Sequence, residues 1–410
     1  MIPSDYPHVF EREPTALMMT PGAHQLFDAL NGEARFVGGC VRDCLLGQTP
    51  GDIDIATPWQ PSSVDKRLSR AGFSIHPIGI EHGTVLAVTP DRTGQFEVTT
   101  LRQDIETDGR HAVVKFTASY REDAKRRDLT FNALSMGPEG HVFDYFDGIA
   151  DLRAGRVRFV GDPNQRIQED YLRILRYFRF FARYGTLEPD ATTLQALRDN
   201  LEGIRGLSGE RLEAELSKML VGPRAMTITQ KMNDIGLLEL IMGRPLDLEG
   251  FKRLIGLEGA LGVPNVERRF AVLLSRSRAR IDTLADRFKW PNRVRHRLRL
   301  MAQGELPPYN IETMIYRFGA TTAQDWLVLT SVELNQAVNP ELWALTQNWQ
   351  PPKFPINGED IMHAGVPHGP GVGDVRLELE EWWLAQGFAP GRNDLLERLS
   401  QIVGDRFPAY

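Results

Sequence analysis

The chain has 410 residues, of which 42% are hydrophobic and 25% charged, which is typical of a globular protein with two to four domains and not of a disordered or fibrous one. Its formal net charge of −6 argues against a uniformly basic nucleic-acid coat, although a local basic track remains compatible with it. No apolar run reaches the length of about 18 residues that a membrane-spanning helix needs, and the N-terminus lacks the basic start and apolar stretch of a secretory signal.

Short β-rich runs alternate with turn residues and a few helices up to about residue 150; they lie at 84–89, 96–101, 111–116 and 141–145. From residue 151 helical periodicity dominates, and the clearest predicted helices are 165–184, 209–220 and 224–241. Segments rich in Pro and Gly, predicted to be joints between helical units, lie at 243–245, 262–264, 307–308 and 351–355. This order predicts an α+β fold in which a β-containing head is followed by an all-α remainder.

The most informative segment of the head spans residues 36–57. An apolar run ends in Gly38-Gly39, a predicted helix follows, and a predicted strand then carries Asp52 and Asp54. Alternate residues of a strand point to one face, so the two carboxylates are expected to project together. Such carboxylates repel each other unless a hard cation lies between them, and Mg²⁺ with substrate phosphates is the usual solution. The glycines let a phosphate approach backbone N–H groups at a helix start, so the segment predicts nucleotide chemistry.

Two cysteines, Cys40 and Cys44, occur in the sequence, four residues apart on the predicted helix of this segment. That spacing suits a disulfide poorly, and no Cys/His metal pattern surrounds them. We expect both to be small buried side chains in a protein of the reducing cytoplasm.

Glu97 stands in the β-rich run after this segment, in the same predicted head. It is either a third active-site carboxylate or a strand-edge acid that faces water, and the sequence leaves both readings open. The charged residues 104–111 that follow contain an Asp108-Gly109 turn, which predicts a mobile loop.

Residues 126–134 read RRDLTFNAL. The arginines, among them Arg127, offer planar donors for phosphate oxygens. Asp128 and Asn132 are spaced i,i+4 and are predicted to share a helical face from which they can hydrogen-bond a ribose hydroxyl. The alternative is a solvated helix start that Asp128 caps.

Residues 168–176 read QEDYLRILR, and their spacing makes Asp170 and Arg173 neighbours on the predicted helix. A carboxylate accepts from an exocyclic amine and a guanidinium donates to a ring nitrogen; cytosine and adenine offer that pattern, whereas uracil and guanine invert it. The pair is therefore predicted to accept CTP and ATP and to reject UTP and GTP. The alternative is an ordinary helix salt bridge worth about 0.2–0.5 kcal/mol. Glu169 is expected to support the helix.

Basic residues concentrate between Arg268 and Arg299 although the chain is acidic overall. Binding to a phosphate backbone is one explanation, and a solvated helix face is the other. A weaker RNA-binding stripe is predicted at Arg173, Arg176, Arg179 and Arg183. Charged residues in 209–216 are expected to brace helices.

These motifs together resemble those of class II tRNA nucleotidyltransferases and bacterial poly(A) polymerases, within the DNA polymerase β-like superfamily. The resemblance implies a small mixed-sheet catalytic head and two-metal nucleotidyl transfer, with Asp52 and Asp54 as Mg²⁺ ligands and Glu97 as a further catalytic acid. It also implies a head at 1–150, a neck at 151–225, a body at 226–305 and a tail at 306–410, the helical domains binding tRNA. The nucleotide contacts that it implies come from Gly39, Arg42, Arg127, Asp128, Asn132, Asp170, Arg173 and Arg176.

The function expected from the resemblance is addition of CCA to the 3′ end of tRNA from CTP and ATP, without a nucleic-acid template. A poly(A) polymerase is the nearest alternative, but residues 79–85 (GIEHGTV) resemble the tRNA enzymes and the C-terminus lacks a long basic tail. Enzymes that add only CC or only A remain open, and the loop at 104–111 favours full CCA addition. A noncatalytic RNA-binding relative would not need the metal-binding and base-reading residues together.

Overall fold

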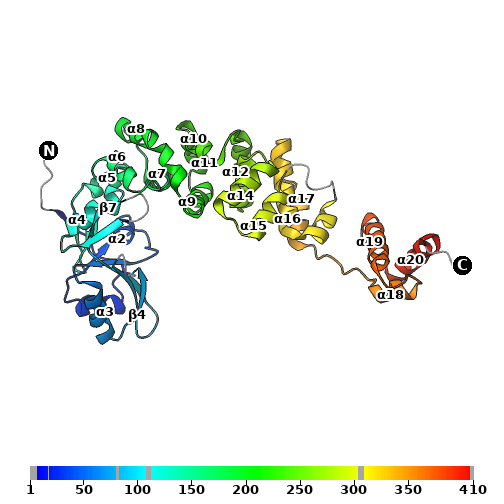
Figure 1. Ribbon diagram of the computed structural model, residues 1–410, viewed down its shortest axis with the longest axis horizontal. Helices are drawn as coiled ribbons and strands as arrows, with labels where there is room; N and C mark the ends of the chain where they lie inside the picture. Colours follow the sequence, from blue (N-terminus) through cyan, green and yellow to red (C-terminus); the bar gives the residue numbers. More distant parts are fainter. Residues whose placement is uncertain (1–6, 17, 80–82, 108–111, 303–308, 407–410) are drawn as a thin grey trace. The chain divides into compact units, whose positions relative to one another are not determined.

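The computed structural model describes residues 7–16, 18–79, 83–107, 112–302 and 309–406. The chain forms two compact units, Met1–Gly243 and Arg244–Tyr410 (Figure 1). Their boundary coincides with the predicted joint at 243–245. Among the described residues, no helix is both long enough and apolar enough to cross a membrane.

The first unit contains β1 (His8–Glu11), β2 (Arg35–Val37), β3 (Asp54–Thr57), β4 (Ser74–Gly79), β5 (Thr84–Val88), β6 (Gln95–Thr100), β7 (Arg102–Thr107), β8 (Ala112–Phe116), β9 (Ser135–Met136) and β10 (His141–Asp144). Eight of them form one sheet in the order β1-β10-β9-β2-β3-β6-β5-β4, while β7 and β8 pair separately. Neighbours in the large sheet are antiparallel except β3 and β6, which are parallel. The predicted mixed sheet is confirmed, and the four β-rich runs correspond to β5, β6, β8 and β10.

An apolar core covers one face of the sheet. Side chains of α1 (Pro21–Ala29), α2 (Gly39–Leu45) and α3 (Pro61–Arg70) pack there against strand residues such as Ile55 and Val98. Ile55 and Val98 are register partners in β3 and β6, as are Asp54 and Glu97 one position earlier. Because side chains alternate along a strand, Asp54 and Glu97 share the opposite face. The apolar core thus fixes which way the two acids point.

Helices occupy most of the remainder of the first unit: α4 (Tyr120–Lys125), η2 (Thr130–Asn132), α5 (Gly148–Ala154), α6 (Pro163–Glu169), α7 (Arg173–Tyr184), α8 (Ala191–Asp199), η3 (Leu201–Gly206), α9 (Gly209–Val221), α10 (Ala225–Asp234) and α11 (Leu237–Met242). The helix predicted at 209–220 is confirmed as α9. A single helix over 165–184 is wrong, because Asp170 is extended (φ −156°, ψ 105°) and its Oδ1 accepts from the Leu172 N–H at 3.1 Å. The helix predicted at 224–241 is likewise broken, at Gly236 with φ +85°.

Three predictions fall partly or wholly on residues that the structure does not describe. The loop predicted at 104–111 is wrong for residues 104–107, which belong to β7, and residues 108–111 lie outside the described chain. Residues 80–82 of the GIEHGTV segment and the joint at 307–308 lie outside it too.

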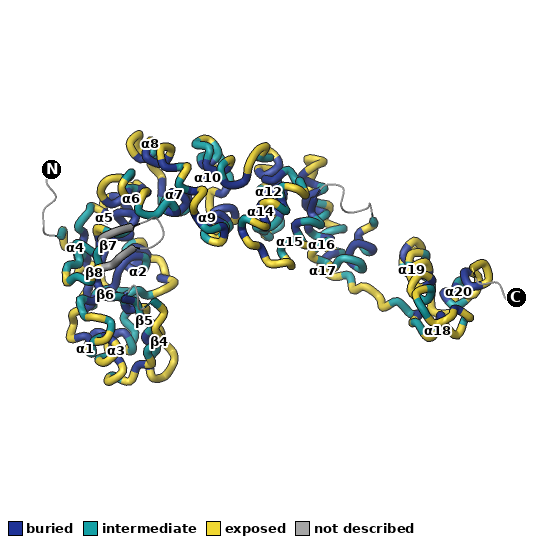
Figure 2. The backbone as a smooth tube through the Cα atoms, in the orientation of Figure 1, coloured by how far each residue is buried: buried dark blue, intermediate teal, exposed yellow. Residues whose placement is uncertain are grey.

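The second unit is built from α12 (Leu248–Leu261), α13 (Val266–Leu273), α14 (Arg278–Phe288), α15 (Asn292–Leu300), α16 (Ile311–Leu334), α17 (Pro340–Asn348), α18 (Gly358–His363), α19 (Pro370–Ala385) and α20 (Arg392–Arg406). Along these helices buried and exposed residues alternate, as expected for amphipathic helices (Figure 2). The predicted joints at 262–264 and 351–355 separate α12 from α13 and α17 from α18.

Much of the basic segment is neutralised inside this unit. The fully buried Glu258 accepts from Nε of Arg268 at 2.8 Å and from Nε of Arg269 at 2.7 Å. The buried Asp325 accepts from Nη1 of Arg268 at 3.0 Å and from Nε of Arg297 at 2.7 Å. We call these five residues the buried ion network. Neither sequence-based explanation, RNA binding or a solvated helix face, accounts for Arg268 and Arg269, because both are buried and paired with acids.

Glu258→Gln is expected to destabilise the second unit by about 3–5 kcal/mol, because it removes a fully buried counter-charge from Arg269 and one of the two acids that pair with Arg268. Chemical denaturation of the full chain, followed by circular dichroism, measures the effect. Glu249→Gln, on the exposed side of the same helix, is the control and is expected to stay within about 0.5 kcal/mol of the wild type. Equal stabilities of the two variants would contradict the prediction.

Candidate active site

A cavity of about 620 Å³ opens between the sheet and the helices that follow it in the first unit. Its volume lies in the range of about 300–1,000 Å³ found for small-molecule sites. The lining contains eight arginines and four aspartates, which suits a polyanion such as a nucleoside triphosphate. All eight residues predicted to contact the nucleotide line this cavity, as do Asp52 and Asp54. The full lining is Gly38, Gly39, Arg42, Asp52, Asp54, Arg126, Arg127, Asp128, Asn132, Asp170, Leu172, Arg173, Arg176, Arg179, Phe180, Arg183 and Arg211.

The acidic part of the cavity is formed at the start of β3. Asp54 is the first residue of that strand, whereas Asp52 lies in the bend before it, so the prediction that both stand on the strand is wrong for Asp52. Glu97 is the β6 register partner of Asp54 and is exposed. Burial and the negative charges of Glu97 and Asp52 raise the pKa of Asp54 above its ordinary value, and Arg127 opposes the shift.

This concentration of acids fits a divalent cation shared with a substrate. Within the described residues, no three His, Cys, Asp or Glu side chains converge closely enough to enclose a metal ion. Mg²⁺ usually takes only one or two protein carboxylates and completes its coordination with water and substrate phosphates. The carboxylates of Asp52 and Asp54 therefore suit Mg²⁺ held together with a triphosphate.

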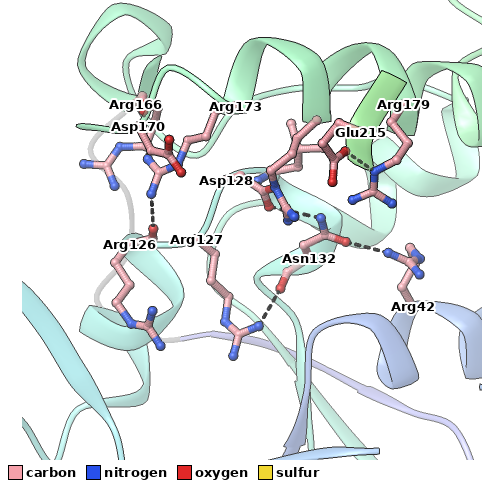
Figure 3. A network of polar contacts seen from close by, with 12 residues as sticks. Arg42, Arg126, Arg127, Asp128, Asn132, Arg166, Asp170, Arg173, Arg179 and Glu215 are labelled. Atoms are coloured by element: carbon pink, nitrogen blue, oxygen red, sulfur yellow. Dashed lines mark hydrogen bonds and ion pairs between the residues drawn. The ribbon is translucent and has the colours of Figure 1, made fainter. Parts of the chain in front are cut away.

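The glycine segment brings the start of α2 against the arginines. Gly38 has φ +75°, a conformation that residues with side chains rarely adopt, and a Cβ there would lie 2.7 Å from Nη1 of Arg127, so a larger residue would strain the backbone and displace that guanidinium. Arg42 is buried, and its Nη1 donates to Oδ1 of Asn132 at 2.7 Å (Figure 3). Its Nε donates to Oδ1 of Asp43 at 2.9 Å. The helix α2 is thus tied to the RRDLTFNAL segment.

Cys40 and Cys44 are both buried and unpaired, as predicted. Burial raises the pKa of the Cys40 thiol to about 12. The two cysteines belong to the core and not to the chemistry of the cavity.

Asp128 and Asn132 meet, but not on a helical face. The chain turns between α4 and η2, and Nδ2 of Asn132 donates to Oδ1 of Asp128 at 3.0 Å (Figure 3). Oδ2 of Asp128 accepts from Nε of Arg176 at 2.7 Å, and Oδ1 also accepts from the Leu129 N–H at 2.8 Å. Burial opposes ionisation of Asp128, yet the Arg176 guanidinium and the hydrogen bonds hold its pKa below the ordinary value. Both carboxylate oxygens are therefore engaged before any ribose arrives.

Asp170 and Arg173 flank the break between α6 and α7, and not one helix face as predicted. Nη1 of Arg173 donates to Glu169 at 2.6 Å and its Nη2 donates to the Arg126 carbonyl at 3.0 Å (Figure 3). Oδ2 of Asp170 accepts from Nη2 of Arg211, on α9, at 2.7 Å. Glu169, predicted to support a continuous helix, instead pairs with Arg173 across the break. Asp170 and Arg173, the two base-reading candidates, both line the cavity.

Two residues of α9, Arg211 and Glu215, lie at or beside the cavity, although the sequence predicted only that they brace helices. Glu215 is buried and accepts from Nε of Arg179 at 2.6 Å (Figure 3). Arg211 and Glu215 are spaced i,i+4 and so share one face of α9. The spacing predicts that the two side chains project from one face of the helix. Nothing in the neighbouring sequence indicates which other helix that face contacts.

Comparison with known proteins gives a consistent result. A family model described as "Poly A polymerase head domain" matches residues 34–158, and one described as "Probable RNA and SrmB- binding site of polymerase A" matches residues 186–245. The chain is 36% identical over 399 residues to "CCA tRNA nucleotidyltransferase 1, mitochondrial" of Danio rerio, covering 93% of this chain and 90% of that protein. It is 31% identical over 386 residues to a "CCA-adding enzyme" of Levilactobacillus brevis, covering 90% and 94%.

A solved structure extends the similarity to the fold. The crystal structure of the Bacillus stearothermophilus CCA-adding enzyme in complex with CTP superposes with a TM-score of 0.77 at 26% identity, covering 95% of this chain and 99% of that one. The predicted fold class, a mixed-sheet head followed by helices, is therefore confirmed.

Proposed function

The chain belongs to the family of CCA-adding tRNA nucleotidyltransferases, and we propose that it adds C, C and A in turn to the 3′ end of tRNA from CTP and ATP. The single observation that supports this most directly is that one cavity is lined both by Asp52 and Asp54 and by Asp170 and Arg173. The first pair suits phosphoryl chemistry and the second suits recognition of an amino-substituted base. Both are needed for nucleotide addition without a template.

We propose that Mg²⁺ is the divalent metal and that Asp52 and Asp54 hold it, with Glu97 as a third carboxylate beside them. The chemistry that Mg²⁺ supplies when bound is positive charge, which acidifies a hydroxyl and offsets charge that develops on phosphate oxygens. In the reaction, the 3′-hydroxyl oxygen of tRNA forms a bond to the α-phosphorus of the nucleotide, and the bond from that phosphorus to the leaving pyrophosphate breaks. Asp52 and Asp54 would hold the reacting phosphate at the edge of the sheet.

The other residues of the cavity would bind and orient the nucleotide. Arg42 and Arg127, together with the backbone at Gly39, would contact the triphosphate. Asp128 and Asn132 lie between this end and the base-reading end, which suits the ribose; Arg176 would orient Asp128. Asp170 would accept from N4 of cytosine or N6 of adenine, and Arg173 would donate to the ring nitrogen beside it.

For tRNA binding we propose the neck at 151–225, the body at 226–305 and the tail at 306–410. The buried ion network removes Arg268 and Arg269 from any RNA-binding surface. We also propose that the protein works in the cytoplasm, to which its two buried free cysteines are suited; the Danio rerio relative is a mitochondrial protein.

Incubation of the protein with Mg²⁺, individual nucleotides and tRNAs that end at the discriminator base, at C or at CC tests the proposed function. We expect CCA to be added to the first substrate, followed by a stop. Long A-tracts would indicate a poly(A) polymerase instead, and addition of A to CC ends alone would indicate a specialised enzyme.

The metal assignment predicts a pH dependence. A raised pKa means that protonated Asp54 stabilises the metal-free fold; this contribution is complete below the ordinary value of 3.8 and is lost as pH rises through the raised pKa. Mg²⁺ relieves the repulsion among ionised carboxylates, so we expect it to raise the Tm more at neutral pH than in mildly acidic buffer. Thermal scans with and without Mg²⁺ measure this difference. In Asp54→Asn the difference should shrink strongly, and an unchanged difference would contradict the assignment.

A further inference from the structure

Tyr184, the last residue of α7, contacts the phosphate-facing helix α2 across 141 positions of sequence. Its hydroxyl donates to Oδ1 of Asp43 at 3.1 Å, and the guanidinium carbon of Arg42 lies 4.7 Å from the centre of its ring. Burial of the phenol, with the nearby Asp43 carboxylate, raises the pKa of Tyr184 against the opposing effect of Arg42. The hydroxyl therefore stays protonated and able to donate at neutral pH.

This contact closes a ring of polar interactions that begins and ends on α7. Asp43 accepts from Arg42, Arg42 donates to Asn132, Asn132 donates to Asp128, and Asp128 accepts from Arg176, which lies two turns before Tyr184 on α7. We call this set the α2–α7 ring; its members are Asp43, Arg42, Asn132, Asp128, Arg176 and Tyr184. Arg42 and Asp43 are each only 6% exposed, so water competes weakly for their hydrogen bonds.

Packing holds the tyrosine in place as well. Its ring stacks on Phe180 (centroids 6.1 Å apart, interplanar angle 22°) and meets the edge of Phe131 at 5.6 Å. Phe131 belongs to η2, beside Asn132. The aromatic contacts therefore join η2 to α7, and the hydrogen bonds of the α2–α7 ring join both of them to α2.

We propose that Tyr184 is a positioning residue for nucleotidyl transfer: through Asp43 it fixes Arg42, and so holds the triphosphate-binding end of the cavity in register with α7. This inference rests on the proposed function, because it takes Arg42 as a phosphate contact. Tyr184 does not line the cavity. Its effect on the reaction therefore passes through Arg42.

Displacement of a positioning group lowers the rate of the chemical step more than it weakens binding, because the reacting atoms must be aligned in the transition state. For Tyr184→Phe we expect kcat to fall about tenfold for CTP and for ATP alike, which corresponds to the loss of one hydrogen bond to a charged group. We expect KM for both nucleotides to change less than about threefold. Rejection of UTP should be unchanged, because Asp170 and Arg173 are not members of the ring.

Tyr177 provides a matched control on the same helix. It is also buried, and among the described residues its hydroxyl has no hydrogen-bond partner. Tyr177→Phe thus removes the same atom from α7 without touching the ring, and we expect wild-type kcat. Equal losses in the two variants, or a Tyr184→Phe enzyme within twofold of wild-type kcat, would overturn the proposal.

A double-mutant cycle with Tyr184→Phe and Asp43→Ala tests the route of the effect, because alanine removes the oxygen that accepts from the tyrosine hydroxyl. Because both changes break the same hydrogen bond, the double variant is expected to lose less activity than the product of the single losses. Losses that simply multiply would overturn the role of Asp43 as the link. Pyrophosphate release with any accepted nucleotide serves as the readout, so a wild-type enzyme that adds a tail other than CCA would refute the proposed function and leave this test intact.

Discussion

Asp52→Ala is expected to reduce nucleotide transfer to every tRNA end by roughly a thousandfold or more, because it removes one of the two carboxylates that suit the metal. Asp52 is exposed and lies before β3, so the fold should not depend on it. Single-turnover incorporation of labelled CTP and ATP at saturating Mg²⁺ measures the loss. The loss should be the same for both nucleotides, since the metal contacts phosphates and not bases.

Asp65→Ala is a suitable control for this experiment. Asp65 is an exposed acid on α3 of the same unit and does not line the cavity. The control removes the same charge from the head and should retain full activity. An Asp52→Ala enzyme that kept more than a few per cent of wild-type turnover would remove Asp52 from the metal site.

Asp170→Ala is expected to lower the preference for CTP over UTP by about a hundredfold, because the carboxylate that accepts from the exocyclic amine is gone. Most of this change should come from a lower kcat/KM for CTP, and part from a higher kcat/KM for UTP, since O4 of uracil no longer meets a carboxylate. The kcat/KM for ATP should fall together with that for CTP. The ratio of kcat/KM values for the nucleotides on one tRNA measures it. Transfer itself should persist, which separates this variant from Asp52→Ala.

Asp170 also pairs with Arg211, so Asp170→Ala changes the net charge of the unit as well as base recognition. A second variant that removes one acid elsewhere controls for the change in charge. Asp199→Ala removes an exposed acid from α8 of the same unit, where its Oδ1 accepts from Gln195 at 2.7 Å, and should leave base choice unchanged. If Asp170→Ala rejected UTP as strictly as the wild type, Asp170 and Arg173 would not be the base readers.

The sequence was sufficient to predict the fold class and the residues that converge on the cavity, because these depend on strand alternation and on motifs of strong local character. It did not predict the break at Asp170. The apolar periodicity of α6 continues into α7, and the break depends on an aspartate that bonds to the backbone two residues later. The spacing of apolar residues does not show that the Asp170 side chain takes the Leu172 N–H and so interrupts the helix.

Partners distant in sequence account for the remaining errors. Arg268 and Arg269 look like part of an RNA-binding surface when the basic segment is read alone, but Glu258 and Asp325, which pair with them inside the unit, lie outside that segment. Arg211 and Tyr184 were not recognised for the same reason. Each acquires its role from a side chain that the fold brings to it, respectively Asp170 and Asp43.

The hydrogen bonds of Asp128, Asp170 and Arg173 have a consequence for turnover. Each of these groups already has partners within the protein, so a nucleotide bound as we propose would enter by exchange: a bond to the ligand would replace or share a bond within the protein. The net gain in free energy on binding would then be small, and a base that cannot reproduce the exchange would be rejected. An enzyme that must take up three nucleotides in succession and release pyrophosphate each time benefits from such an exchange, because no intermediate state is held too tightly to leave.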